Sequence, residues 1–265
     1  MNRIAELFAK KRAAKKSALI AYITAGDPTP ERTPALVAAL ERGGADLIEL
    51  GVPFSDPIAD GPVVMKASER ALRAGTTLVK VLDIARTVRK TSQIPLLLFS
   101  YLNPLMRYGF AKLAADAKAA GIDGCLLTDL SVEEAGEFIE PMRANGLDTV
   151  FLAAPTSPPE RLKAVAEHSS GFIYLVSRTG VTGEQAQLSA SVGPLVKAIR
   201  AHTDLPLAVG FGISKPEQAG ETARLVEGVV VGSAIVRVVE KYGASPDLVA
   251  KLEEFARQLK AGMEG

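Results

Sequence analysis

The chain has 265 residues, of which 48% are hydrophobic and 23% are charged. This composition excludes a disordered chain, and the length allows one large α/β domain or two small ones. Lys and Arg number 31 against 30 Asp and Glu, so the formal net charge is only +1. Such a balance lacks the basic excess of a nucleic-acid or membrane-surface binder, which leaves a small molecule as the expected partner.

Cysteine and histidine are too scarce for several classes of site. The single cysteine, Cys125, excludes a disulfide framework and a thiolate-rich metal site, and it suits a reducing cytoplasm. Two histidines cannot supply a three-histidine zinc site. Because no apolar run approaches the roughly 20 residues that span a bilayer, we expect a cytoplasmic chain that binds neither membrane nor nucleic acid.

Residues 1–16 predict a short amphipathic helix. Ile4, Leu7 and Phe8 share one face of it, and basic residues surround that face. A basic amphipathic start can also be an organelle leader, but Glu6 and the scarcity of serine disfavour that interpretation. We expect this helix to pack its apolar face on the domain that follows.

Short apolar runs rich in Val, Ile and Leu recur along the chain, and eight of them predict strands. These are residues 18–24, 47–50, 95–101, 125–128, 149–153, 172–177, 207–211 and 228–231. Most are nearly continuous in apolar residues, as in parallel strands that are covered on both faces. Helical stretches between them include residues 34–42, 111–120, 132–145, 159–167, 192–202 and 216–225.

The repeat of about 30 residues has the size of a βαβ unit. Eight such units predict an α/β fold, a (β/α)8 TIM barrel with an extra N-terminal helix, and residues 1–265 form one domain. The alternative is a doubly wound open sheet, which normally carries a glycine fingerprint after its first strand. Residues 24–28 (TAGDP) contain no such fingerprint, so we favour the barrel.

Two strand-end segments are longer than the repeat requires, namely residues 51–62 and 178–191. Both follow the carboxyl ends of strands, where barrel enzymes build their active sites and lids. No lysine ends a strand, so a Schiff-base aldolase lacks its nucleophile. His168 and His202 precede strands and are expected on the opposite face, which makes metal chemistry through histidine unlikely for this barrel.

Two carboxylates are candidates for proton chemistry. Glu49 interrupts the apolar second strand near its end, where an inward position would raise its pKa toward neutrality. Asp60 lies in a proline-bounded loop that could close over Glu49. The pair suits proton transfer and stabilisation of positive charge. From these residues alone, a structural carboxylate and a turn-capping aspartate remain alternatives.

Glycine-containing turns follow the sixth, seventh and eighth strands, at residues 180–183, 210–214 and 232–234. The backbone N–H groups of such turns, with a helix N-terminus after the eighth strand, form the usual phosphate site of barrels. Ser233 adds a side-chain donor there. The glycines could also serve tight turns alone, but the added donor favours a phosphorylated substrate.

Residues 50–62 (LGVPFSDPIADGP) closely resemble the signature of the tryptophan synthase α chain family. The resemblance covers nearly the whole chain, through residues 23–28, 101–104, 128–130, 177–183, 210–213 and 231–234. It implies a carbon–carbon lyase of tryptophan biosynthesis that cleaves indole-3-glycerol phosphate to indole and D-glyceraldehyde 3-phosphate. That retro-aldol reaction needs neither a metal nor a Schiff base.

The resemblance also assigns roles to individual residues. Glu49 would protonate indole C3, Asp60 would accept the indole N1–H, and Tyr174 would assist. The residues expected around the indole are Tyr22, Phe99, Leu126, Phe211 and Thr182, the last bonding to Asp60 when the lid closes. Tyr22 stands where other family members have Phe. The residues expected to hold phosphate are Gly183, Phe211, Gly212, Gly232 and Ser233.

In the family, the α chain works with a pyridoxal-phosphate β chain in an α2β2 complex. The resemblance therefore implies a β-chain partner, no cofactor in this chain and pyridoxal phosphate in the partner. The matching surface consists of Pro53, Asp56, Asn103, Pro104 and Arg107. The alternatives are a free-standing indole-3-glycerol phosphate lyase, another phosphate-binding barrel isomerase or epimerase, and a silent activator of a β chain.

Overall fold

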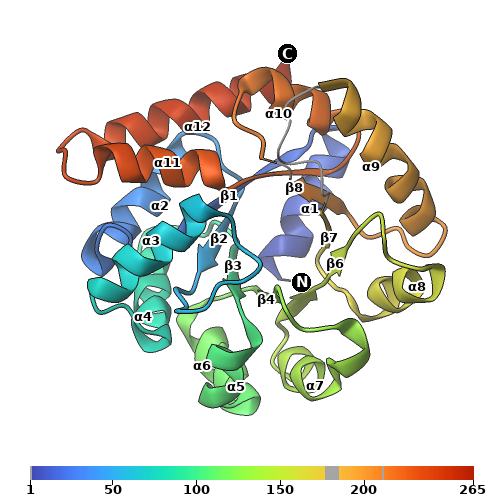
Figure 1. Ribbon diagram of the computed structural model, residues 1–265, viewed down its shortest axis with the longest axis horizontal. Helices are drawn as coiled ribbons and strands as arrows, with labels where there is room; N and C mark the ends of the chain where they lie inside the picture. Colours follow the sequence, from blue (N-terminus) through green and yellow to red (C-terminus); the bar gives the residue numbers. More distant parts are fainter. Residues whose placement is uncertain (1, 177–184, 211) are drawn as a thin grey trace.

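The computed structural model describes residues 2–176, 185–210 and 212–265, and side chains are described outside residues 177–191 and 211. In these ranges, nine parallel strands form one sheet in the order β5-β4-β3-β2-β1-β9-β8-β7-β6. The strands are β1 (Ala18–Thr24), β2 (Leu47–Gly51), β3 (Leu96–Ser100), β4 (Gly124–Leu127), β5 (Asp148–Val150), β6 (Leu152–Ala153), β7 (Ile173–Val176), β8 (Leu207–Gly210) and β9 (Gly228–Val231). The predicted (β/α)8 barrel is confirmed, and Figure 1 shows its helices arranged around the sheet.

All eight predicted strands overlap observed ones, and the fifth is divided in two. Phe151 separates β5 from β6, which stand at the two ends of the sheet order. The interruption is small, because the Tyr174 backbone N–H still donates to the Phe151 carbonyl over 3.1 Å. The sheet therefore closes into a barrel at this position.

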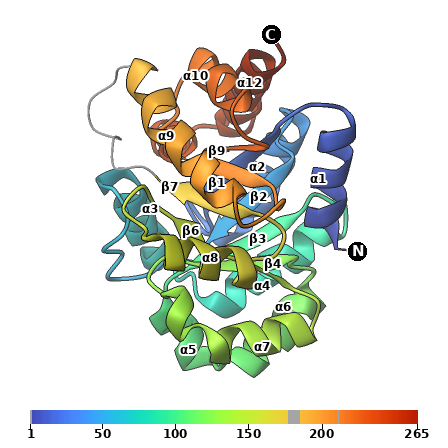
Figure 2. The same cartoon turned by 90° about the vertical axis from the view of Figure 1, so that its right-hand side faces the viewer.

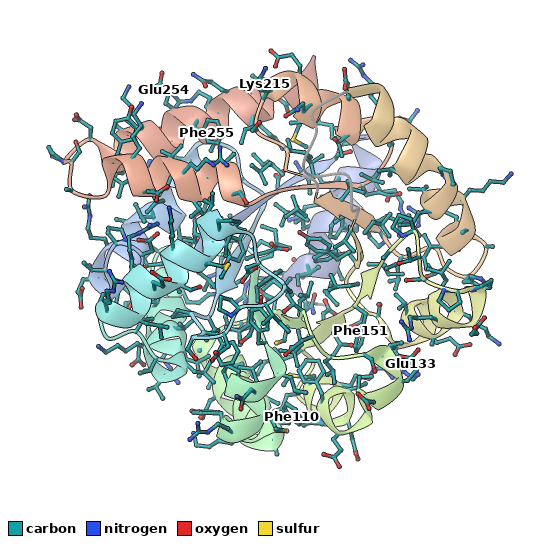
Figure 3. All side chains as sticks on the ribbon, in the orientation of Figure 1. Phe110, Glu133, Phe151, Lys215, Glu254 and Phe255 are labelled. Atoms are coloured by element: carbon teal, nitrogen blue, oxygen red, sulfur yellow. The ribbon has the colours of Figure 1, made fainter. Side chains whose placement is uncertain are left out.

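Twelve α-helices are described around the barrel. They are α1 (Arg3–Ala13), α2 (Thr33–Arg42), α3 (Pro62–Arg73), α4 (Leu78–Arg89), α5 (Leu102–Tyr108), α6 (Phe110–Ala120), α7 (Gly136–Ala144), α8 (Pro159–His168), α9 (Gln185–Arg200), α10 (Pro216–Ala223), α11 (Ser233–Tyr242) and α12 (Leu248–Glu264). Charged side chains such as Glu133 and Glu254 project from this outer layer (Figure 3). No helix in the described ranges is both long and apolar enough to cross a membrane.

The extra length after β2 is not all loop. Residues 52–61 form the loop, and α3 and α4 then fill the rest of the interval before β3. The tail of the second long segment is also partly helical, since α9 begins at Gln185. When only the strands are counted, these helices are assigned to the long segments between strands, because helices with polar outer faces resemble loop sequence.

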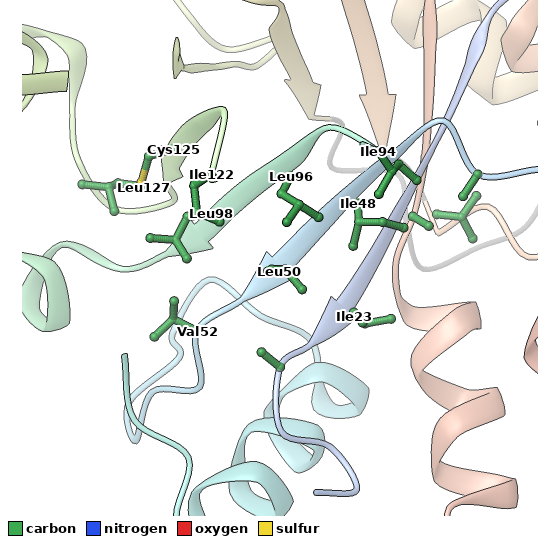
Figure 4. Close-up of a cluster of buried hydrophobic side chains, with 14 of the residues drawn as sticks. Ile23, Ile48, Leu50, Val52, Ile94, Leu96, Leu98, Ile122, Cys125 and Leu127 are labelled. Carbon is green, nitrogen blue, oxygen red and sulfur yellow. The ribbon is translucent and has the colours of Figure 1, made fainter. Parts of the chain in front are cut away.

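Each strand divides its side chains between two cores, because successive residues point to opposite faces. Ile48, Leu50, Leu96 and Leu98 face outward and pack under the helices (Figure 4). Cys125 lies in the same layer with its thiol buried, and burial raises the pKa of that thiol. This cysteine is therefore a small apolar core residue.

The alternate residues fill the inside of the barrel. Ile20, Leu97 and Phe172 meet there, and Ile4 and Phe8 of α1 join the same cluster. The Phe8 and Phe172 rings lie 5.6 Å apart between centroids. Figure 2 shows α1 at one end of the sheet. The apolar face of α1 thus packs on the strands and covers the inner core at the end where the strands begin.

Buried ion pairs reinforce that end of the barrel. Asp123 is 3% exposed, and it accepts hydrogen bonds from Arg3 (2.8 Å), Arg89 (2.9 Å) and the Leu96 backbone N–H (2.9 Å). The carboxylate therefore joins α1, α4 and the start of β3. Removal of the Asp123 carboxylate takes the ion-pair partner from both guanidinium groups at once, so it should lower the free energy of unfolding substantially.

We expect Asp123→Ala to lower the free energy of unfolding by about 3 kcal/mol or more, because the variant leaves partly buried cations and a backbone N–H unpaired. Urea denaturation measures this change. The control is Asp83→Ala, which removes an exposed carboxylate paired with Arg86 on the surface of α4 and should cost less than about 1 kcal/mol. Equal losses in the two variants would contradict a structural role for Asp123.

Candidate active site

A pocket of about 590 Å³ opens at the carboxyl ends of the strands. It brings together eight of the predicted site residues, namely Tyr22, Glu49, Asp60, Phe99, Tyr174, Gly212, Gly232 and Ser233. These residues come from β1, β2, β3, β7 and the turns after β2, β8 and β9. The expectation that the site lies on the strand-end face therefore holds for all eight.

The remaining predicted pocket residues have other outcomes. Leu126 is fully buried in the inner core and does not line the pocket. It pairs in register with Phe99, but only the longer aromatic side chain reaches the cavity. Its predicted contact with the ligand stays a prediction. Thr182, Gly183 and Phe211 lie outside the described residues.

Glu49 is buried at the centre of the site. It stands on β2 between Tyr22 of β1 and Leu97 of β3, and it is 1% exposed. Neither carboxylate oxygen has a hydrogen-bond partner among the described residues. Burial disfavours the charged form and raises the pKa of Glu49 to about 8. At neutral pH the group is mostly a protonated acid that faces the cavity, which is the state of a proton donor.

Asp60 occupies the loop that leads into α3. Burial raises its pKa to about 6, and the nearby Tyr101 hydroxyl opposes part of that rise. The residue before α3 is Gly61, and no side chain caps this helix. Asp60 is therefore not the N-cap residue of α3. With a pKa near 6 it is mostly ionised at neutral pH, while Glu49 is mostly protonated.

Tyr101 is a site residue whose role the sequence analysis missed. Its hydroxyl accepts a hydrogen bond from the Ala59 backbone N–H at 3.0 Å, and its ring packs on Phe54 with centroids 5.3 Å apart. One tyrosine thus holds both ends of the loop that carries Asp60. Its position at the end of the third predicted strand, residues 95–101, was the available signal, because strand-end residues build the active face.

Two tyrosines form the walls of the pocket, and each lies against a glycine. A Cβ at Gly51 would come within 2.3 Å of the Tyr22 hydroxyl, and one at Gly210 within 2.4 Å of the Tyr174 hydroxyl. The Tyr22 ring also meets Phe99 edge to face, with centroids 5.2 Å apart. Burial raises the pKa of both tyrosines well above the usual value, so both hydroxyls stay protonated.

A second part of the pocket suits an anion. Gly232 and Ser233 line it where α11 begins, and the N-cap residue of that helix is Gly232, which has no side chain to cap it. The first N–H groups of a helix lack internal partners and carry partial positive charge. Gly212 adds a backbone turn at φ +62°, a conformation that favours glycine. These donors and the helix dipole match the predicted phosphate site.

The described residues contain no cluster of three His, Cys, Asp or Glu side chains that could hold a metal ion. The polar groups at the pocket are instead carboxyl, hydroxyl and backbone N–H groups. Such a set can donate and accept protons, hold an anion and orient an aromatic ring. The geometry therefore suits acid–base chemistry on a ligand that is aromatic at one end and anionic at the other.

The predicted partner surface lies beside the pocket on the loop after β2 and on α5. Asp56, Asn103 and Arg107 are exposed and Pro104 is half-buried, but Pro53 is buried within the chain. Two large apolar side chains are exposed in the same segments, with Ile58 at 86% and Met106 at 55%. Leu105, in contrast, is fully buried, so the apolar surface of α5 is narrower than its sequence indicates.

Comparison with known proteins agrees with this geometry. The sequence model described as "Tryptophan synthase alpha chain" matches residues 8–264. The tryptophan synthase alpha chain of Solibacter usitatus is 65% identical over 262 residues, covering 99% of this chain and 98% of the relative. That of Geotalea uraniireducens is 52% identical over 264 residues, covering 100% and 98%.

Solved structures give the same result. Tryptophan synthase subunit alpha from Legionella pneumophila superimposes with a TM-score of 0.93 at 38% identity, covering 100% of this chain and 99% of that chain. A structure of Mycobacterium tuberculosis tryptophan synthase gives 0.90 at 36% identity, covering 99% and 98%. From its sequence, its fold and the pocket described above, the chain belongs to the tryptophan synthase α chain family.

Proposed function

We propose that this chain is a carbon–carbon lyase that cleaves indole-3-glycerol phosphate to indole and D-glyceraldehyde 3-phosphate in tryptophan biosynthesis. The observation that carries the proposal is Glu49, a buried carboxyl group without a described partner that faces the pocket. Its pKa of about 8 keeps a proton available at neutral pH. The membership of the tryptophan synthase α chain family supports the same reaction.

The pocket orients the substrate from its two ends. The N-terminus of α11, with Gly232 and Ser233, holds the phosphate group. The indole lies between the aromatic walls formed by Tyr22 and Phe99, and its N1–H donates to the Asp60 carboxylate. This arrangement places indole C3, the ring carbon that bears the glycerol phosphate chain, near Glu49 on β2.

Glu49 then donates one proton to the substrate and later accepts one from it. Its carboxyl group protonates indole C3, and the positive charge that develops at the ring nitrogen is stabilised by ionised Asp60. The bond between C3 and the glycerol chain breaks, and its electron pair restores the aromatic indole. The hydroxyl group on the departing carbon becomes the aldehyde of glyceraldehyde 3-phosphate and returns a proton to the Glu49 carboxylate.

We propose that the chain needs no cofactor of its own for this reaction. The two carboxyl groups account for each proton that the cleavage moves, and the tyrosine hydroxyls supply further hydrogen bonds. Pyridoxal phosphate is then held by the partner β chain of an α2β2 complex. The β chain docks on Asp56, Asn103, Pro104 and Arg107, beside the exposed Ile58 and Met106.

Glu49→Gln should lower kcat by about 10²- to 10⁴-fold, since the amide cannot donate the proton. Its affinity for indole-3-propanol phosphate, which cannot be cleaved, should change less than about twofold because the amide keeps the shape of the side chain. Stopped assays of indole release and titration calorimetry measure the two quantities. The melting temperature at pH 8 should not fall, because the amide carries no charge to desolvate. Substantial residual turnover would place the acid elsewhere.

The pH profile of kcat/KM should be bell-shaped. It should fall above pH 8 as Glu49 loses its proton and below pH 6 as Asp60 gains one, as their pKa values of about 8 and about 6 require. The Tyr101 hydroxyl lowers the pKa of Asp60, so Tyr101→Phe should shift only the acidic limb, to higher pH. The substrate phosphate also titrates near pH 6, but identically in both enzymes.

The control for this profile is Tyr108→Phe, which removes a hydroxyl bonded to Asp116 on the outer surface of α5 and α6. The acidic and basic limbs of the pH profile of this variant should coincide with those of the unaltered chain. Identical acidic limbs in Tyr101→Phe and Tyr108→Phe would show that Tyr101 does not control the protonation of Asp60.

Titration with the cognate β chain should accelerate indole release, and Asp56→Ala should weaken this stimulation by about tenfold in the β-chain concentration required. The basal rate of the variant and its melting temperature should stay unchanged, because Asp56 is exposed. Asp83→Ala, an exposed carboxylate on α4, is the matched control. Fast turnover without any stimulation would instead indicate a free-standing lyase.

A further inference from the structure

One face of α3 runs from the pocket to a buried ion pair. Val64 lines the pocket in the first turn of the helix. Ala67, one turn further, is fully buried in a cluster with Tyr22 and Val236. Arg70 follows on the same face, because residues three and four positions apart share a helix face. Only Gly61 separates Asp60 from this helix, so the placement of α3 constrains where Asp60 lies.

Arg70 binds two other elements of the barrel. Its Nε and Nη2 atoms donate to the two carboxylate oxygens of Asp27, each over 2.8 Å, and Asp27 is 3% exposed in the turn after β1. Its Nη1 atom donates to Glu240 of α11 over 3.4 Å. The Asp27 carboxylate raises the pKa of Arg70. Paired parallel bonds of this kind fix orientation as well as distance, and only arginine provides them.

The two helices that Arg70 connects both begin at the substrate pocket, and they pack on each other. α3 begins just after Asp60, whereas α11 begins at Ser233 in the anion site. Between these first turns and the ion pair, Ala67 of α3 and Val236 of α11 lie in one apolar cluster with Tyr22 of β1. Both helices are short and regular, so a bond between their later turns constrains the distance between their first turns.

We propose that Arg70 is a positioning residue that sets the distance between Asp60 and the phosphate-binding N-terminus of α11, and thereby the length of substrate that the pocket accepts. This inference rests on the proposed function, in which one molecule reaches from Asp60 to Ser233. Such a molecule must match the distance between the two subsites. A fragment that occupies only one subsite has no such requirement, because it never spans them.

The test compares one spanning ligand with its two fragments. Indole-3-propanol phosphate spans the pocket, whereas indole and glycerol 3-phosphate each occupy one end. Calorimetry on Arg70→Met should show about a tenfold higher Kd for the spanning ligand. Misplacement of groups in an active site by about 1 Å can lower the rate by up to about 10²-fold, and we expect a similar mismatch to weaken binding of a ligand that must reach both subsites. The Kd values of both fragments should change less than about twofold. Arg70→Lys should behave similarly, because an ammonium group keeps the charge but cannot form the paired bonds.

The matched control is Arg73→Met on the same helix. Arg73 is 80% exposed, and its one ion pair among the described residues is with Glu69 at 3.6 Å, so its removal should leave all three Kd values unchanged. Glu240→Gln gives a milder version of the proposed effect without altering Arg70. Retained fragment binding also establishes that each variant is folded.

Two results would overturn the role of Arg70. The first is an unchanged Kd for the spanning ligand in both Arg70 variants. The second is an equal loss for the spanning ligand and the fragments, which would mean general damage to the barrel. Failure of the unaltered chain to bind indole-3-propanol phosphate would refute the proposed function itself. This outcome is distinguishable from failure of the role of Arg70, because it is measured without any variant.

Discussion

The site depends on Glu49, whose carboxyl group is buried in the barrel and has no hydrogen-bond partner among the described residues. An ionised carboxylate at the position of Glu49 would cost several kcal/mol of desolvation, so the group instead keeps its proton and its pKa rises to about 8. Hydrogen bonding to the backbone on both sides fixes β2 between β1 and β3. The strand thus cannot turn this side chain toward water.

The rest of the pocket is arranged around that acid by the parallel strands. All the strands point the same way, so their end residues meet on one face. Glycines at positions 51 and 210 leave space for the Tyr22 and Tyr174 hydroxyls. Asp60 lies on a loop rather than on a strand, which leaves it less buried than Glu49 and gives it the lower pKa of the two. One fold therefore supplies an acid and an anion from two similar carboxyl groups.

The barrel and the positions of Glu49 and Asp60 could be predicted because they depend on local pattern. Apolar runs mark buried parallel strands, and polar residues at their ends mark the active face. The features that the sequence leaves open have a common physical cause. Whether Leu126 or Phe99 reaches the cavity depends on side-chain length within one layer of the barrel. The roles of Tyr101 and Arg70 depend on partners far along the chain, which no local pattern specifies.

Carboxyl groups at the two ends of the barrel differ in whether they have a charged partner. Where the strands begin, buried Asp123 has two arginine partners, and Asp46 binds both Lys11 and Lys260. Where they end, Glu49 has no described partner. A barrel can tolerate this because buried apolar layers separate the two faces, so ion pairs at one end stabilise the fold without neutralising the acid at the other. Buried Asp27 also lies where the strands end, but it is paired with Arg70, so in our proposal this charge governs geometry rather than proton transfer.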